Sequence, residues 1–345
     1  MPAPYLTDQD IVDLLTGTLR QLNRNEISDI SQELQDYPVM RNWLKSERVT
    51  FDDGAGWQHT IMRRTPGNAS ESGLFDEDET SYTNILDKMQ VEWARFKTFW
   101  IVERRMLVEN SGGSRIVDII APQRKGSMVD LAALLEDRAW TLRTAAQTDK
   151  LNGVPYYIVK TATQGFNGGL PAGHTTVAAV NLTTVPHYKN WTDAYVNVSK
   201  TDLIKKMRKA YKRCGFKSPV DIGDFRGSMG RRYRIYMNEN TLTDIETQAE
   251  LQNNQLGPDI ASMDEMTVFK KIGLEWIPFL DNDTSDPVYG IDHNVFYFVV
   301  LSEDYFRESD PRISPRSHNV IETFVDLSCQ IVCLSRRNCF VIAKF

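Results

Sequence analysis

The sequence predicts an α+β protein with two lobes, and three observations lead to this fold class. The first is one long amphipathic helix, predicted over Ser127–Asn152. The second is a long, aromatic-rich, strand-forming segment that precedes this helix. The third is a series of short apolar runs after it, which surround a second, basic helix. With 345 residues, 41% of them hydrophobic, the chain is long enough to bury a sizeable core.

The helix predicted over Ser127–Asn152 acts as a spine between the two other parts. Ser127 can cap its first turn, while Gly153 and Pro155 favour an end at Asn152. At about 1.5 Å per residue, about 22 helical residues would form a rod of about 33 Å. Apolar side chains recur at intervals of three and four and so share one face. They are Met128, Leu131, Leu135, Ala139 and Leu142, with Leu134 and Trp140 widening the stripe.

The segment before the spine divides into an arm and a flap. Residues 1–48 are polar and carry one short amphipathic helix, which Thr7 and Asp10 would cap. Residues 49–110 predict a long two-stranded flap, with one strand in 49–64 and the other in 93–110. The tip between them contains the acidic run Asp76–Glu79.

The flap has an unusual aromatic load for a segment that a two-stranded hairpin would leave exposed. Two interpretations are open: the rings pack on their own domain, or some of them are anchors for a neighbouring chain. The candidate subunit-interface residues are Trp57, Phe75, Trp93, Phe96, Phe99 and Trp100.

The part after the spine predicts a compact lobe. A helix over 202–214, opened by Ser199 and Asp202, has one apolar and one basic face, and the basic face favours solvent or another subunit over nucleic acid. A second helix is predicted over Thr241–Leu251. The predicted strands are Val154–Lys160, Arg234–Asn238, Phe269–Phe279, Val295–Leu301, Val325–Ser335 and Cys339–Lys344, the last two split by a basic turn at Arg336–Asn338.

Composition and motifs argue against several classes of function. The net charge of −6 and pI of about 5.5 disfavour a dedicated nucleic-acid binder. The longest apolar run is far shorter than a membrane span, and the first residues do not form a secretory signal. The histidines and cysteines lack metal-ligand spacing, so no metal or cofactor site is expected and the four cysteines are predicted to be buried free thiols. No catalytic motif is present, which lowers the expectation of an enzyme.

The order of these parts resembles the major capsid protein of tailed bacteriophages, whose fold is shared with herpesvirus shell proteins. Three stretches carry the resemblance: WIVERRMLVENSGGSRIVDII at Trp100–Ile120, VPHYKNWTDAYVNVSKTDLIKKMRKAYKRCGF at Val185–Phe216, and the closing DHNVFYFVVLSEDYF with VDLSCQIVCLSRRNCFVIAKF. The resemblance covers most of the chain from Val49 onward. It rests on topology more than on specific motifs.

The resemblance implies a fold divided into four parts. Residues 1–48 would be the N-terminal arm and 49–110 the extended loop. Residues 111–185 and 321–345 would form the peripheral domain around the spine helix at 127–152. Residues 186–320 would form a mixed α/β axial domain at the centre of each capsomer.

The resemblance also implies assembly in place of catalysis. Subunits would form the hexamers and pentamers of an icosahedral shell around double-stranded DNA, with each flap over a neighbour. Expected partners are other copies, a separate scaffolding protein, portal and decoration or tail-connector proteins, and weakly bound DNA, with no membrane. The protein would be made in the host cytoplasm and reside in the virion capsid. The competing interpretation is a soluble oligomeric enzyme or a host-side binding module.

Overall fold

The computed structural model describes residues 49–63, 69, 71, 84–105, 120–215, 233–253, 268–270 and 272–345. The predicted arm at 1–48, the acidic run Asp76–Glu79 and Phe75 lie outside the described residues. The first elements are β1 (Val49–Asp52), β2 (Gly56–Met62), β3 (Leu86–Glu92), β4 (Ala94–Glu103) and α4 (Ile120–Trp140). Then follow α5 (Val154–Tyr157), β5 (Gly165–Gly168), β6 (Asn190–Ala194), α6 (Leu203–Arg213), β7 (Tyr233–Met237), α7 (Glu239–Asn253), β8 (Val268–Phe269) and β9 (Ile272–Trp276). The last are η3 (Pro278–Leu280), β10 (Val288–Asp292), β11 (Phe296–Leu301), η4 (Ser302–Asp304), β12 (Arg307–Glu308), β13 (Arg312–Ile313), β14 (Val320–Cys333), η5 (Arg336–Asn338) and β15 (Phe340–Ala343).

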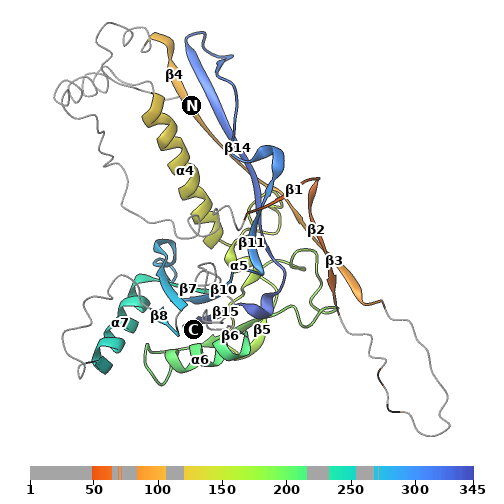
Figure 1. The fold of residues 1–345 in the computed structure, drawn as a ribbon, viewed down its shortest axis with the longest axis vertical. Helices are drawn as coiled ribbons and strands as arrows, with labels where there is room; N and C mark the ends of the chain where they lie inside the picture. The colour runs from red at the N-terminus through yellow and green to blue at the C-terminus, as the bar shows by residue number, and fades with distance from the viewer. Residues whose placement is uncertain are drawn as a thin grey trace, which may run out of the picture. The chain divides into compact units, whose positions relative to one another are not determined.

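The chain divides into two compact units, and each is described by itself. The first unit includes the described parts of Lys97–Ala133 together with Phe306–Asp326. The second unit includes the described parts of Tyr37–Phe96 and Leu134–Tyr305 together with Leu327–Phe345. Helix α4 and the strands β4 and β14 contribute residues to both (Figure 1).

The described strands form three sheets. A seven-stranded mixed sheet has the order β5-β6-β15-β10-β7-β9-β8. A six-stranded sheet has the path β1-β11-β14-β12, with β13 and β4 also paired to β14. The strands β2 and β3 form a separate antiparallel hairpin. Helices and mixed sheets in one chain make this an α+β fold, as the sequence predicts.

The spine helix is present, but its predicted bounds are wrong. Helix α4 spans Ile120–Trp140, so it begins before Ser127 and ends well before Asn152. Ser127 is therefore not a cap: its hydroxyl lies inside the helix and contacts the carbonyl oxygens of Gln123 and Phe99. The predicted apolar face is correct at its centre, because Leu131, Leu135 and Ala139 are buried, whereas Leu134 is exposed.

The predicted flap is a hairpin, but one of its two strands is wrong. The partner of β2 is Leu86–Glu92, which the sequence analysis assigns to no strand, and the two pair from Gly56↔Glu92 to Met62↔Leu86. The predicted second strand corresponds to β4, which pairs with β14. The single strand predicted in 49–64 is in fact two strands, because β1 pairs with β11 in parallel before β2 begins.

Among the other local predictions, one strand is wrong, while two helices and the closing strands are confirmed. Val154–Lys160 is not a strand: α5 places Pro155 in its first turn and buries Tyr156 and Tyr157. The basic helix and the helix after β7 are confirmed, and so are the closing strands. Although adjacent in sequence, β14 and β15 belong to different sheets, since the turn η5 between them is not a hairpin turn.

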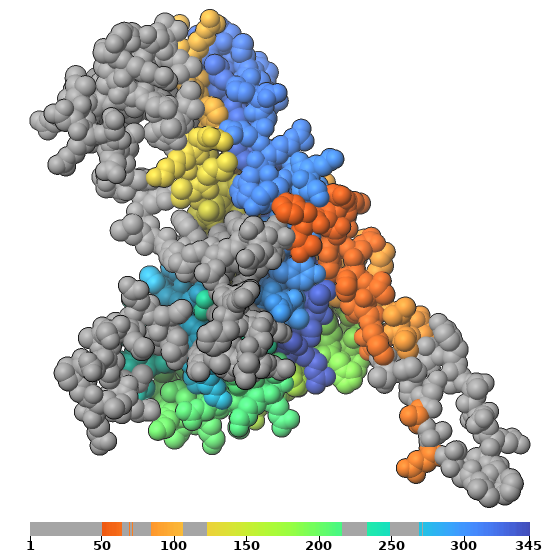
Figure 2. Space-filling model, viewed as in Figure 1, coloured from red at the N-terminus to blue at the C-terminus, as the bar shows by residue number. Residues whose placement is uncertain are grey.

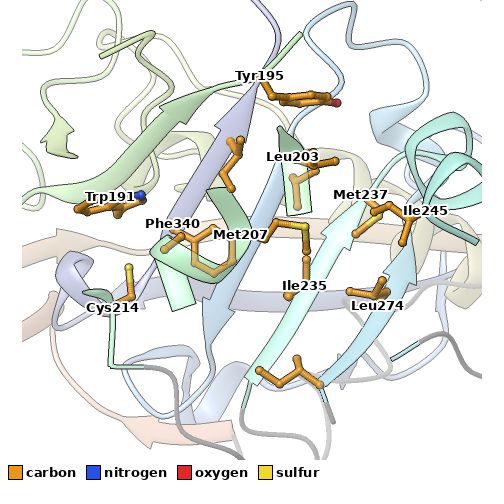
Figure 3. Packing of buried hydrophobic residues seen from close by; sticks show 14 of the residues in the cluster. Trp191, Tyr195, Leu203, Met207, Cys214, Ile235, Met237, Ile245, Leu274 and Phe340 are labelled. Carbon is orange, nitrogen blue, oxygen red and sulfur yellow. The ribbon is translucent and has the colours of Figure 1, made fainter. Parts of the chain in front are cut away.

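The main core of the second unit lies between one face of the seven-stranded sheet and the helices α6 and α7. Leu203, Met207 and Ala210 of α6 and Ile245 of α7 belong to one apolar cluster with residues of β7, β9 and β15 (Figure 3). Gly290 on β10 makes room for this core, since a Cβ there would lie 2.1 Å from the ring of Phe340. All four cysteines are buried and free.

A fully buried arginine holds together the loops beside this core. Arg336 donates hydrogen bonds to the carbonyl oxygens of Tyr157, Tyr188, Gly168 and Gly169 and to Asn190 Oδ1. Its guanidinium also lies 5.5 Å from the centre of the Tyr188 ring. Burial lowers the pKa of Arg336. Within the described part of the chain, no helix is both long enough and apolar enough to cross a membrane.

Candidate subunit-contact surfaces

One face of the β2–β3 hairpin is largely buried, apart from the exposed His59, and the other face is exposed. Trp57 lies opposite Val91 and His59 opposite Met89, and the alternation of strand side chains places all four on one face. Trp57, Met89 and Val91 are buried. Met62 and Leu86 are directly opposed on the other face, and they are 57% and 55% exposed. The described hairpin thus ends in an uncovered apolar pair.

The base of the hairpin is anchored by a strained turn. The amides of Val177 and Val180 bond to each other's carbonyl oxygens, and Ala178 and Ala179 between them have φ of 51° and 64°. The left-handed region costs a residue with a Cβ roughly 1–2 kcal/mol. Ala178 N–H donates to the Tyr156 hydroxyl, and its carbonyl accepts the amide of Gln90 on β3. This turn therefore links β3 to α5.

The structure separates the predicted interface aromatics into buried and accessible rings. Trp57 and Trp93 are 4% and 6% exposed, and Trp93 Nε1 donates to the carbonyl of Gly54 at 2.8 Å. These two rings therefore pack on their own chain. Phe96 is half-buried, and Phe75 lies outside the described residues.

Phe99 and Trp100 lie on opposite faces of β4. Phe99 is 57% exposed. Trp100 is half-buried, and its Nε1 donates to Glu308 Oε1 at 3.3 Å. Glu308 also forms an ion pair of 2.6 Å with Arg124 of α4. Of the two neighbours, only Phe99 presents most of its ring to the surface.

An apolar sheet face surrounds Phe99 in the first unit. The Phe99 and Phe324 rings are 5.9 Å apart, and the Arg312 guanidinium lies 4.7 Å from the Phe324 ring. Ile101 is two residues beyond Phe99, so it is on the same face, and it is 39% exposed. Arg312 also forms an ion pair of 3.3 Å with Glu322. We call Phe99, Ile101 and Phe324 the β4–β14 face.

Ile101, Phe324 and the Met62–Leu86 pair are candidate contact residues that the sequence did not predict. The alternation Phe99-x-Ile101 on β4 was available as a signal for one exposed face. Nothing local indicated that Phe324 would be its cross-strand neighbour, because that depends on β4 pairing with β14.

A polar cavity of about 370 Å³ lies beside the base of the hairpin. Its walls include Arg143, Asn152, Tyr156 and His174. The Arg143 guanidinium is already bonded to Asn152 Oδ1 and to the carbonyls of Thr144 and Gln147, and it stacks on Tyr156. His174 Nε2 contacts the Arg143 carbonyl oxygen at 3.0 Å. These contacts stabilise the loop that lines the cavity.

The described residues contain no group of three or more His, Cys, Asp or Glu side chains placed to hold a metal ion. Burial raises the pKa of Cys214, Cys329 and Cys333, which keeps these thiols protonated and unreactive. The candidate contact residues of the described chain are the exposed Met62, Leu86, Phe99 and Ile101.

Comparison with known proteins identifies the fold. A scan of protein families finds no match, and no curated sequence matches the chain. The solved capsid of cyanophage A-1(L) matches with a TM-score of 0.64 and 11% identity, over 93% of this chain and 96% of the phage chain. This chain has the fold of the tailed-phage major capsid protein.

Other shells share this capsid fold. The capsid of a native GTA particle matches with a TM-score of 0.62 and 10% identity, covering 93% of this chain and 95% of the other. The SrpI encapsulin of Synechococcus elongatus PCC 7942 matches with a TM-score of 0.52 and 8% identity, covering 94% of each chain. The agreement extends over nearly the whole length of each protein, while the identities are too low to show more than the fold.

Proposed function

We propose that the protein is the major capsid protein of a tailed bacteriophage, a structural subunit and not an enzyme. It assembles into the hexamers and pentamers of an icosahedral shell that encloses double-stranded DNA. The observation that carries the proposal is the capsid fold along 93% of the chain. The exposed β4–β14 face and the Met62–Leu86 pair support it, because apolar patches of this kind mark contact sites between proteins.

The parts of the fold take corresponding roles in this proposal. Residues 1–48 form the arm, and 49–110 form the extended loop that covers a neighbour. Residues 111–185 and 321–345 form the peripheral domain, whose spine is α4, and 186–320 form the axial domain. Trp57 and Trp93 are buried in their own chain, so in this proposal they would contribute to the packing of the loop. Phe99, with Phe75 as a candidate from the sequence, would then contact the neighbouring subunit.

The shell requires partners besides further copies of the chain. We propose a separate scaffolding protein, a portal, and decoration or tail-connector proteins. DNA would be held weakly and without sequence preference, because the subunit carries a net charge of −6. The subunit would be made in the host cytoplasm and end in the virion.

The test is the size and form of the purified protein. Negative-stain microscopy and light scattering, with and without a crowding agent, should show rings or closed particles. A monomer or small closed oligomer under all these conditions would contradict the proposal and favour a soluble enzyme or binding module.

The contents of the particles test the phage assignment separately, because an encapsulin shares the fold. Particles isolated from the native source should contain nuclease-protected double-stranded DNA. Closed particles without nucleic acid would support a shell function but contradict the phage assignment, and they would favour an encapsulin-like shell.

A further inference from the structure

Helix α6 presents a dense basic surface that the described part of its own subunit does not neutralise. Its apolar side is fixed in the core by Leu203, Met207 and Ala210. The exposed cations on its outer side are Lys205, Arg208, Lys209, Lys212 and Arg213. Within the described residues, α6 forms one ion pair, between Lys206 and Asp202. We call the five exposed cations the α6 stripe; Figure 2 shows the green residues of this part of the chain at the molecular surface.

Helix α7 and the turn after β9 present the opposite charge. Glu239 and Asp244 of α7 are exposed, and so is Asp281. Asp281 accepts hydrogen bonds from the Glu239 amide at 2.9 Å and from Trp276 Nε1 at 2.9 Å. The Trp276 ring is 40% exposed beside these acids. We call Glu239, Asp244, Asp281 and Trp276 the α7 patch.

The two charged surfaces come from one helical layer of the second unit. Residues of α6 and α7 belong to the same apolar cluster, so both helices cover the same face of the seven-stranded sheet. Helix α6 packs on β6 and β15, while α7 packs on β9 (Figure 3). The strands β10 and β7 lie between β15 and β9. At about 4.8 Å per strand, the two supporting regions are about 14 Å apart. The subunit thus carries a basic and an acidic surface in different halves of one layer.

A ring of identical subunits needs two different surfaces that fit each other, because each head-to-tail contact joins one surface of a copy to another surface of the next. Complementary charge sets the register of such a contact and speeds its formation. An exposed tryptophan surrounded by polar groups is typical of an interface anchor, and arginine or lysine binds favourably over its ring.

We propose that the α6 stripe of one copy docks on the α7 patch of the next copy around the capsomer ring. This inference rests on the proposed shell function and adds the pair of surfaces that orders the ring. The proposed binding partner is a second copy of this chain, because five exposed cations on one surface match three exposed acids and a tryptophan on the other. The cations would form ion pairs with Glu239, Asp244 and Asp281 and cover Trp276.

The experiment is a charge swap on the full chain. Variant B is Lys205→Glu/Arg208→Glu/Lys209→Glu, which changes the charge of the α6 stripe from +5 to −1. Variant A is Glu239→Lys/Asp244→Lys, which changes the charge of the α7 patch from −3 to +1. Each alone should lower the yield of rings and particles by at least about tenfold, because like charges then face each other. The combined five-substitution variant should restore the yield, since opposite charges meet again. The matched control, Lys125→Glu/Arg138→Glu/Lys150→Glu, makes the same change in net charge as variant B on exposed basic residues elsewhere and should assemble normally.

Mixing the two single-surface variants gives a sharper test. Variant B has two acidic surfaces and variant A has two basic surfaces, so an even-membered ring can alternate them with every contact attractive. A five-membered ring must place two copies of one variant side by side. Equimolar mixtures should therefore form six-membered rings and open sheets or tubes, and few closed particles with pentameric vertices.

Several outcomes would overturn this inference, and they differ from failure of the proposed function. All variants should keep the circular dichroism spectrum and melting behaviour of the wild type. If the wild type assembles and B or A assembles equally well, the two surfaces do not meet. If both single-surface variants and the combined variant remain folded but none of them assembles, the two surfaces do not bind each other and bind other partners. If B forms normal rings and loses only packaged DNA, α6 faces nucleic acid. If the wild type itself forms no rings, the proposed function fails first.

Discussion

Replacing Arg336 with lysine tests whether the buried guanidinium holds the loops beside the core of the second unit. Lysine keeps the positive charge and the approximate length of the side chain. It loses the planar arrangement of five N–H donors, because an ammonium group has three. The structure gives Arg336 five separate acceptors: four carbonyl oxygens and Asn190 Oδ1.

The size of the effect follows from these acceptors. Three ammonium donors leave at least two of the five acceptors without a hydrogen bond from residue 336, although Asn190 Oδ1 still accepts the Val159 amide. A buried hydrogen bond to a charged group contributes about 1.5–3 kcal/mol, so Arg336→Lys should cost about 3–6 kcal/mol. Domains are stable by about 5–15 kcal/mol, so the change would remove a large share of the total. Gly168 leaves the network no room to rearrange, since a Cβ there would lie 1.8 Å from Asn190 Oδ1.

The neighbouring residue provides the control. Arg337 is exposed, contacts His187 Nδ1 at 3.0 Å and lies 4.4 Å from the Phe166 ring centre. Arg337→Lys keeps the charge and most of this contact, so it should cost about 1 kcal/mol or less. Urea unfolding of the unassembled protein, followed by circular dichroism, measures both. Equal unfolding midpoints for the two variants would refute the reasoning, because the buried network would then contribute no more than a surface contact.

Three further predictions concern assembly and acid stability. Phe99→Asp should keep the melting temperature and reduce particle yield, because most of this ring is exposed. Trp93→Asp should unfold the protein, because it places a charge in a buried site. Thermal melting and microscopy measure both effects, and loss of the fold in both variants would contradict the prediction. Replacing 66–83 with a short Gly-Ser bridge should leave β2 and β3 paired and abolish assembly. Circular dichroism and particle counts measure the two effects. Particles at wild-type yield would contradict the proposed contact between the flap and a neighbouring subunit. Partial burial opposes ionisation of Asp283, but hydrogen bonds from Lys160 and Ser285 outweigh it and lower the pKa of Asp283 below its usual 3.8. The stability from the Asp283–Lys160 pair is therefore fully present above about pH 4 and is lost as the pH falls through the lowered pKa. Asp283→Asn should lower the free energy of unfolding at pH 7 and make stability depend less on pH in acid. An unchanged acid unfolding curve would show that this pair does not contribute to it.

The deletion in the second of these predictions depends on the observed strand pairing. The sequence alone would place the expendable tip at 66–92, because it assigns the second flap strand to 93–110. The structure places Leu86–Glu92 in β3, opposite Gly56–Met62. Removing those residues would destroy the hairpin itself, so the deletion has to end before β3.

The sequence by itself determined the elements whose signal is local. The apolar spacing of Leu131, Leu135 and Ala139 identifies the centre of α4. The amphipathic pattern and Gly215 define α6, and the uniform apolar run at 340–343 defines β15. Such elements follow from periodicity and capping, which need only neighbours along the chain.

Tertiary structure decided what depends on distant partners. The sequence predicts a strand at Val154–Lys160, but Val154–Tyr157 forms the helix α5, which has Pro155 in its first turn and buries Tyr156 and Tyr157. Phe99 and Trp93 are equivalent as aromatic residues of one predicted strand. In the structure Trp93 is buried and bonds to the carbonyl of Gly54, whereas Phe99 on β4 is exposed. Arg336 and Arg337 form one basic turn in the sequence, yet five acceptors brought together from three distant segments bury the first and leave the second in solvent. Burial and hydrogen bonding are set by residues far apart in the chain, so no local pattern could have distinguished them.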